Sequence, residues 1–294
     1  MIKIYNLTKR FDDTIAVKNL SLTFDKGIIG LVGHNGAGKS TLFRLIADVI
    51  LPNSGEILID RVDYRDNSVK GNLFFLCDNP YYPRKGTIKD VITFYDAFYD
   101  IDLIRFNNIV SSFALPVKRK INGFSKGMKR QLFIAIALSI KVKYLLLDEA
   151  FDGLDPLAVE KIKSMILELK DEDRTIIVSS HNISTLDKLV DQYVVLHMGQ
   201  VAIDGDEEVI SKTFTKYQLM TSEPIDVSNF AKLGLGVVSL NKVGSIYHLV
   251  IVKNDSAEEI IQKNIKPSLI EVVPIDTGEL ITIEMLYMKN KEGK

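Results

Sequence analysis

The chain has 294 residues, of which 46% are hydrophobic and 26% are charged, and 37 basic residues stand against 38 acidic ones. This length allows one large domain or two unequal ones, and the balanced charge gives no bulk attraction to nucleic acid or to anionic lipid. A single cysteine, Cys77, excludes an intramolecular disulfide framework and is typical of a reducing compartment. The strongest apolar run, residues 132–140, falls well short of the ~20 residues that span a bilayer.

The N-terminal part reads as short strands and one helix. Strands are predicted over residues 2–5, 16–17, 21–24, 28–32 and 56–60. Leu42, Leu45, Ile46 and Val49 follow the i, i+3, i+4, i+7 spacing of a helix that packs on one side. This region therefore contains a strand, a glycine-rich loop and a helix in succession.

That loop matches the phosphate-binding pattern G-x-x-x-x-G-K-[ST] in the strand–loop–helix context that the pattern requires. Glycines let the backbone approach phosphate oxygens, and the helix N-terminus adds partial positive charge. Lys39 can reach the β- and γ-phosphates of ATP as a catalytic residue, and the Ser40 hydroxyl can ligate Mg²⁺. The predicted ATP-binding residues are Gly33, Asn35, Gly36, Ala37, Gly38, Lys39, Ser40 and Thr41.

Helices and strands alternate further along the chain. Helices are predicted over residues 87–115, from near Ser125, from Pro156 and from about Ile183, and strands over 144–147, 175–179 and 193–196. Such alternation predicts a mainly parallel sheet that is covered by helices.

Two of these strands end in residues that suit phosphate chemistry. Asp148 and Glu149 follow residues 144–147, at the kind of strand end where open α/β sheets bind ligands. Adjacent side chains diverge, so we expect Asp148 to hold Mg²⁺ through its water shell and Glu149 to polarise the attacking water as a catalytic residue. His181 follows residues 175–179, where it could meet the γ-phosphate, although a lone histidine there is more often structural.

The pattern changes near Lys212. Strands over residues 217–220, 237–240, 247–252 and 269–273 alternate with helices over 227–233 and 256–264. This suggests a small α+β appendage, ferredoxin-like in its order of elements. We therefore predict a first domain at 1–212, with a helical subdomain at about 80–140, and an appendage at 213–294.

Over roughly residues 1–210, these motifs resemble the ATP-binding-cassette (ABC) family of ATPase subunits. The resemblance implies a P-loop NTPase core with a mainly parallel sheet, an antiparallel N-terminal β-subdomain and a helical subdomain. It also implies that Phe11 stacks on adenine. The alternative role of Phe11 is simply to pack in the core. Residues 124–128 match the signature segment usually written LSGGQ, so Ser125 and Gly127 should bind the nucleotide of a second subunit. Residues 153–155 match the family's loop that reports across the dimer interface.

Two positions depart from the family pattern. Lys126 and Met128 stand where the commonest signature has Gly and Gln, a form that looks like the exporter-type branch. Asp78 stands at the place of the family's Gln, in a loop that links the core to the helical subdomain. Its carboxylate is shorter and adds negative charge near Mg²⁺, although its oxygen could still bind the ion or a water. A shift of one residue would put Asn79 at that place instead.

The resemblance implies a subunit that binds and hydrolyses ATP with Mg²⁺ and pairs with a second ATP-binding subunit as a homodimer or heterodimer. We expect it to power an exporter of the ABC-2-like type from the cytoplasmic face of the membrane, through a separate integral-membrane permease that docks near residues 80–115. The alternative is a soluble, non-transport ABC ATPase acting on ribosomes or nucleic acid, which the neutral charge balance disfavours.

Overall fold

The computed structural model describes residues 1–83, 85–170, 172–206 and 213–292. The chain divides into two compact units, Met1–Val201 and Ala202–Lys294. The domain boundary predicted at residue 212 falls within 207–212, which lie outside the described residues.

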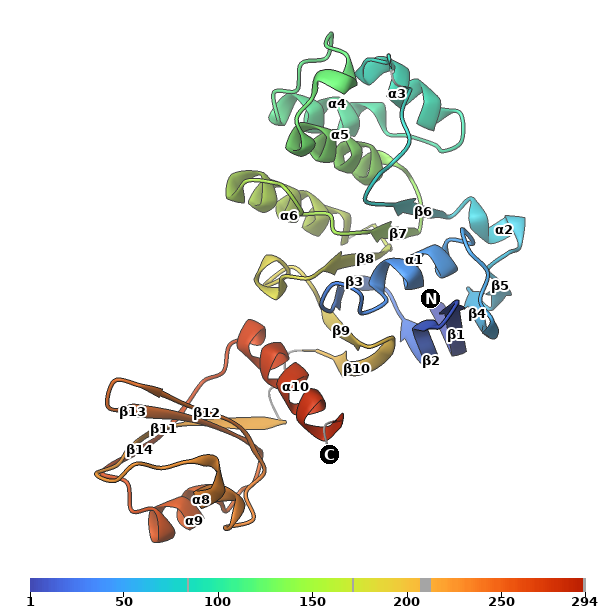
Figure 1. Cartoon of the computed structure of the whole chain (residues 1–294). Coiled ribbons are helices and arrows are strands. Elements are labelled where there is room, and N and C mark those ends of the chain that lie inside the picture. The colour runs from blue at the N-terminus through green and yellow to red at the C-terminus, as the bar shows by residue number, and fades with distance from the viewer. Residues whose placement is uncertain (84, 171, 207–212, 293–294) are drawn as a thin grey trace. The chain divides into compact units, whose positions relative to one another are not determined.

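The first unit begins with an antiparallel sheet of strand order β2-β1-β4-β5 (Figure 1). Its strands are β1 (Ile2–Phe11), β2 (Thr14–Phe24), β4 (Ser54–Ile59) and β5 (Val62–Asp63). Ile2, Ile4 and Leu7 of β1 are buried while intervening residues are more exposed, because one face of this sheet packs on the core. The predicted antiparallel β-subdomain is confirmed. Strands β1 and β2 extend further than the short apolar segments from which they were predicted.

The central sheet has the strand order β10-β9-β3-β8-β7-β6. Its strands are β3 (Gly27–Val32), β6 (Leu73–Leu76), β7 (Tyr144–Leu147), β8 (Thr175–Ser180), β9 (Gln192–His197) and β10 (Gln200–Gly205). The pairs β3·β8, β3·β9, β6·β7 and β7·β8 are parallel, which confirms the mainly parallel sheet. Every residue of β3, β7 and β8 is buried, as in a sheet covered on both faces. This order brings the C-terminal ends of β3, β8, β7 and β6 to one edge.

The helices of the first unit correct one prediction. They are α1 (Lys39–Ile46), α2 (Asn67–Lys70), α3 (Ile88–Asp96), α4 (Leu103–Ser112), α5 (Lys126–Ser139) and α6 (Pro156–Lys170), with 3-10 turns at η1 (Ile121–Gly123) and η2 (Ile183–Thr185). The helical region predicted over 87–115 consists of α3 and α4, because the carboxylate of Asp102 caps a new helix by accepting from the N–H of Arg105. The helix predicted from Ile183 is only the turn η2. Helices α3, α4 and α5 gather beyond β6 (Figure 1).

The second unit has the element order β-α-β-β-α-β followed by a helix. Its elements are β11 (Phe214–Met220), α8 (Val227–Ala231), β12 (Val237–Val243), β13 (Ile246–Val252), α9 (Ala257–Asn264), β14 (Leu269–Val273) and α10 (Thr277–Glu292). The antiparallel sheet has the order β12-β13-β11-β14, which is the ferredoxin-like arrangement. The predicted α+β appendage is confirmed, and α10 is an additional helix that was not predicted.

Among the described residues, none of the helices combines the length and the apolar character that crossing a membrane requires.

Candidate ATPase site

The loop between β3 and α1 is folded so tightly that two positions leave no room for a side chain. A Cβ atom on Gly33 would lie 2.5 Å from the carbonyl oxygen of Leu196, and one on Gly38 would lie 2.5 Å from that of Ala16. Gly38 also has a φ of 106°, in the left-handed region that favours glycine. Residues 33–38 thus form a backbone cradle at the N-terminus of α1, where N–H groups can bind phosphate oxygens.

The predicted ATP-binding residues lie in this cradle and in the first turn of α1. Ser40 and Thr41 are half-buried, and the exposed positions of the cradle are His34, Asn35 and Gly36. Ala37 is buried, and its N–H donates to the carbonyl of His34 at 3.0 Å, which closes the loop.

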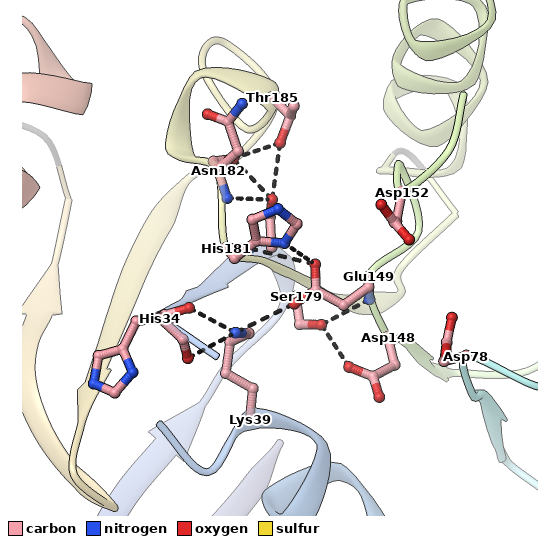
Figure 2. A network of polar contacts seen from close by, with 12 residues as sticks. His34, Lys39, Asp78, Asp148, Glu149, Asp152, Ser179, His181, Asn182 and Thr185 are labelled. Carbon is pink, nitrogen blue, oxygen red and sulfur yellow. Dashed lines mark hydrogen bonds and ion pairs between the residues drawn. The ribbon is translucent and has the colours of Figure 1, made fainter. Parts of the chain in front are cut away.

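Lys39 connects the cradle to the end of β7. Its side chain is only 5% exposed. Its ammonium donates to the carbonyl of Gly33 at 2.6 Å and to that of His34 at 3.4 Å, and it lies 3.2 Å from Oε1 of Glu149 (Figure 2). A buried cation therefore stands between the phosphate-binding backbone and the carboxylate expected to be catalytic.

Glu149 is held by Ser179 of the neighbouring strand β8 and by His181, which follows that strand. Its second oxygen, Oε2, lies 2.9 Å from Nδ1 of His181 and accepts from the backbone N–H of His181 at 3.3 Å. Its φ is 48°, a left-handed conformation that is uncommon for a residue with a side chain. The N–H of Glu149 donates to Oγ of Ser179 at 2.8 Å, which holds this strained backbone in place.

Asp148 is nearly fully buried, at 2% exposure, and the Ser179 hydroxyl donates to its Oδ1 at 2.7 Å. One serine thus orients both acidic residues, a role that the sequence analysis missed. The parallel register pairs Leu147 with Val178, so Ser179 stands directly beside Asp148. Knowledge of the strand order, rather than of any motif, would have revealed it.

The loop after β8 carries His181, and hydrogen bonds among the residues next to His181 fix the loop. The Ser180 hydroxyl donates to the carbonyl of Asn182 at 2.8 Å and accepts from its N–H at 3.0 Å. The Thr185 hydroxyl donates to the same carbonyl at 2.5 Å. His181 itself is about half exposed, at 49%, so its ring is accessible on the side away from Glu149.

Asp78 lies beside Asp148 at the end of β6 (Figure 2). Its Oδ1 accepts from Nη2 of Arg130 at 2.5 Å, and its Oδ2 accepts from the side-chain amide of Asn79 at 3.1 Å. Both carboxylate oxygens therefore already have partners within the protein. The contact with Arg130 was not predicted from the sequence.

The oxygen donors at this site suit a Mg²⁺ ion that takes most of its other ligands from substrate phosphates and water. No group of three or more histidine, cysteine, aspartate or glutamate side chains able to hold a metal occurs among the described residues. Mg²⁺ does not need such a cage, because it is commonly held by one or two carboxylates together with phosphates and waters. The Ser40 hydroxyl in the first turn of α1 and the carboxylate of Asp148 are donors of that kind.

Three further predicted residues lie outside this cluster. Phe11 ends β1, is 44% exposed and has the ammonium of Lys9 at 5.0 Å from its ring centroid, so it does not serve core packing. Ser125 caps α5, where its hydroxyl accepts from the N–H of Met128 at 3.1 Å. Gly127 is half-buried in the first turn of the same helix.

Comparison with known proteins agrees with this geometry. The family model described as ABC transporter matches residues 17–152. In Bacillus subtilis, the ABC transporter ATP-binding protein YtrB is 27% identical over 95% of this chain and 96% of its own length, and NatA is 31% identical over 81% and 100%. The bacitracin transport ATP-binding protein BcrA of Enterococcus faecalis is 29% identical over 85% of this chain and 80% of its own length.

Solved structures show the same fold. A structure described as the ATP-binding subunit of an ABC transporter is 24% identical, with a TM-score of 0.63, and covers 72% of this chain and 92% of that one. The cbiO1 protein of Clostridium perfringens, described as part of the ABC transporter complex cbiONQ, is 26% identical, with a TM-score of 0.58 and coverage of 72% and 93%.

A parallel sheet that ends in a phosphate-binding loop, with a helical subdomain inserted before β7, defines an ATPase of the P-loop class. Within that class, the chain belongs to the family of ABC transporter ATP-binding proteins. It is an ATP-binding and ATP-hydrolysing subunit of a transporter.

Proposed function

We propose that this chain is the motor subunit of an ABC exporter and hydrolyses Mg·ATP at a site that two ATP-binding subunits share. The observation that carries the proposal is the line of contacts from Lys39 through Glu149 to His181, with distances of 3.2 Å and 2.9 Å. These contacts join the phosphate-binding loop to the ends of two adjacent strands. They bring a phosphate-binding cation, a carboxylate base and an imidazole to one edge of the sheet.

Each residue of this line has a distinct proposed role. Lys39 holds the β- and γ-phosphates, since its buried ammonium already lies among phosphate-binding backbone groups. Glu149 accepts the proton of the attacking water, and His181 orients the Glu149 carboxylate and faces the γ-phosphate. Phe11 stacks on adenine, for which its exposed ring is available.

Ser40 and Asp148 would hold Mg²⁺, which neutralises phosphate charge when it is bound. Ser179 supports this role, because it engages only Oδ1 of Asp148 and fixes the carboxylate in one orientation. Asp78 was predicted as a third ligand of the metal, but Arg130 and Asn79 contact its two carboxylate oxygens.

The second subunit completes the site in this proposal. Ser125 and Gly127, at the N-terminus of α5, would bind the nucleotide held by the partner's loop. ATP adds contacts only in the closed dimer and hydrolysis removes them, which gives the switch a direction.

The partner that crosses the membrane would be a separate permease, with this chain at the cytoplasmic face. Among the relatives, BcrA is named for bacitracin transport, and cbiO1 is described as part of a transporter complex. The FSKGM form of the signature segment, at residues 124–128, supports the exporter branch. These relatives favour transport over work on ribosomes or nucleic acid.

The predicted docking region has an exposed aromatic surface. Tyr81 is 66% exposed and Phe98 is 69% exposed, and both rings pack on Phe94 with centroid distances of 5.1 Å and 5.4 Å. Ile104 in α4 is 77% exposed. Apolar side chains exposed together are common at protein–protein interfaces.

Purification of the tagged chain from detergent-solubilised membranes tests this function. We expect co-purification of a polytopic membrane protein and ATP-dependent phosphate release, and recovery of ribosomes or DNA instead would contradict transport. The variant Phe98→Asp should lose the membrane protein but keep ATP binding. Val243→Asp is the matched control, because Val243 is 66% exposed but lies in the second unit.

A further inference from the structure

The buried guanidinium of Arg130 links the C-terminal ends of β6 and β7 to α5, the helix that carries the signature segment. Arg130 lies in the second turn of α5, and its side chain is only 4% exposed. Its Nη2 donates to Oδ1 of Asp78 at 2.5 Å, and its Nη1 donates to the carbonyl of Asp148 at 3.5 Å. One side chain of the helical subdomain therefore contacts both the end of β6 and the end of β7.

A second contact joins the same helix to the loop after Glu149. Lys126, one turn before Arg130, donates to Oδ2 of Asp152 at 2.6 Å. The hydrogen bond with Asp152 raises the pKa of Lys126, and the same bond lowers the pKa of Asp152, so both groups keep their charges. A Cβ atom on Gly127 would lie 3.1 Å from the carbonyl of Gly153, so this loop and the first turn of α5 are in direct contact.

The two ion pairs differ in energetic weight. Lys126 and Asp152 are 68% and 40% exposed, and such surface pairs contribute little. Arg130 is buried, and a buried charge that loses its partner is strongly disfavoured. The contact between Arg130 and Asp78 is therefore the dominant link.

We propose that Arg130 is a positioning residue that holds Asp78, and with it the loop after β6, against α5, so that Ser125 keeps a set position relative to the chain's own catalytic edge. Asp78 then acts as the partner of Arg130 and not as a ligand of Mg²⁺. The inference rests on the proposed function, in which Ser125 contacts the nucleotide of the other subunit. The contacts of Arg130 thus tie the signature segment, which serves the second site, to the strand ends of the first site.

The test compares Asp78→Asn, Arg130→Gln and the double variant in the full-length chain. Each single variant should lower kcat about tenfold and change KM for ATP less than about twofold, because the ion pair positions groups without touching nucleotide. The double variant should be no slower than the slower single variant, since both substitutions remove one interaction. Additive losses in the double variant would overturn the proposal.

Mg²⁺ dependence separates positioning from metal binding. The Mg²⁺ concentration for half-maximal activity should stay at the wild-type value in Asp78→Asn. A several-fold increase over the wild-type value in Asp78→Asn would overturn the proposal and assign Asp78 to the metal. This comparison against wild type also carries the test if Arg130→Gln does not fold, because Asp78 is half-exposed and Asn keeps an acceptor.

A third measurement addresses Ser125. In a Glu149→Gln background, Asp78→Asn should weaken the ATP-dependent dimer seen by size-exclusion chromatography while leaving ADP affinity of the monomer unchanged. An undiminished dimer would overturn the link to the signature segment. The control is Asp100→Asn, which removes the exposed pair with Lys141 at 3.2 Å and should change nothing. A wild-type chain without ATPase activity would contradict the proposed function itself. If the wild type is active but the losses of kcat in the two single variants add in the double variant, only this inference is contradicted.

Discussion

The Nδ1 atom of His181 lies 2.9 Å from Oε2 of Glu149, between the ends of the adjacent strands β8 and β7. The backbone N–H of His181 donates to the same oxygen at 3.3 Å, so two nitrogen atoms of one residue hold the carboxylate. Since Lys39 contacts the other oxygen, the Glu149 side chain has little freedom to turn away.

Replacement of His181 should therefore slow turnover rather than weaken binding. We expect His181→Ala to lower kcat by about 10²-fold or more, because the base loses its orientation and the γ-phosphate loses a positioned group. ATP affinity measured with a fluorescent analogue should stay close to wild type. His181→Asn, which keeps a polar group there, should be less impaired, and an unchanged kcat in His181→Ala would contradict the role.

Two glycines of the phosphate-binding loop should respond differently to alanine. Gly38→Ala places a Cβ atom 2.5 Å from the carbonyl of Ala16 at a φ of 106°, so the loop must shift. Gly36→Ala meets nothing within 4 Å and adds only the strain of its φ of 85°, about 1–2 kcal/mol. Thermal unfolding without nucleotide should show the larger loss of stability in Gly38→Ala. Equal losses would contradict the crowding at Ala16.

The carboxylate of Asp60, which contacts residues at the start of β7, should make the stability of the fold depend on pH. Asp60 accepts from Lys143 at 2.7 Å and from the hydroxyl of Tyr144 at 2.5 Å. Burial raises its pKa, but the hydrogen bonds from Lys143 and Tyr144 outweigh this and hold the pKa well below the usual 3.8. The folded state thus binds its proton less readily than the unfolded state, so this stabilisation is present above about pH 4 and is lost as the pH falls further.

Asp60→Asn should accordingly be less stable than wild type at pH 7, by about 1 kcal/mol, since the carboxylate is partly exposed. Urea denaturation should show this difference narrowing below pH 4. The fully exposed Asp13, 3.6 Å from Arg10, provides the control variant Asp13→Asn, which should match wild type at both pH values. A difference that persists unchanged at low pH would contradict the charge-based explanation.

Local patterns predicted the parts of the site that depend on neighbouring residues. The phosphate-binding loop, the acidic pair after β7 and His181 after β8 each follow an apolar strand, so sequence spacing alone locates them. Strand β6 was missed because four apolar residues, Leu73–Leu76, give no periodicity that separates strand from helix. The break between α3 and α4 was not located within the helical region predicted over 87–115, because apolar residues continue across it.

The contacts that organise the site depend on distant parts of the chain. Ser179 meets Asp148 only because β8 lies beside β7, and Arg130 meets Asp78 only because α5 packs near the end of β6. Neither strand order nor helix packing can be read from spacing. For that reason Asp78 was expected near the metal, and its contact with Arg130 became visible only in the fold.

The most direct test of the catalytic account is a comparison of ATP turnover and ATP retention in Glu149→Gln. The amide keeps the size of the side chain but is a far weaker proton acceptor, so phosphate release should fall by at least about 10²-fold. Bound ATP should be retained at wild-type affinity and recovered intact, since Lys39 and the loop from Gly33 still hold the phosphates. Phosphate release at the wild-type rate would contradict the assignment of Glu149 as the catalytic base.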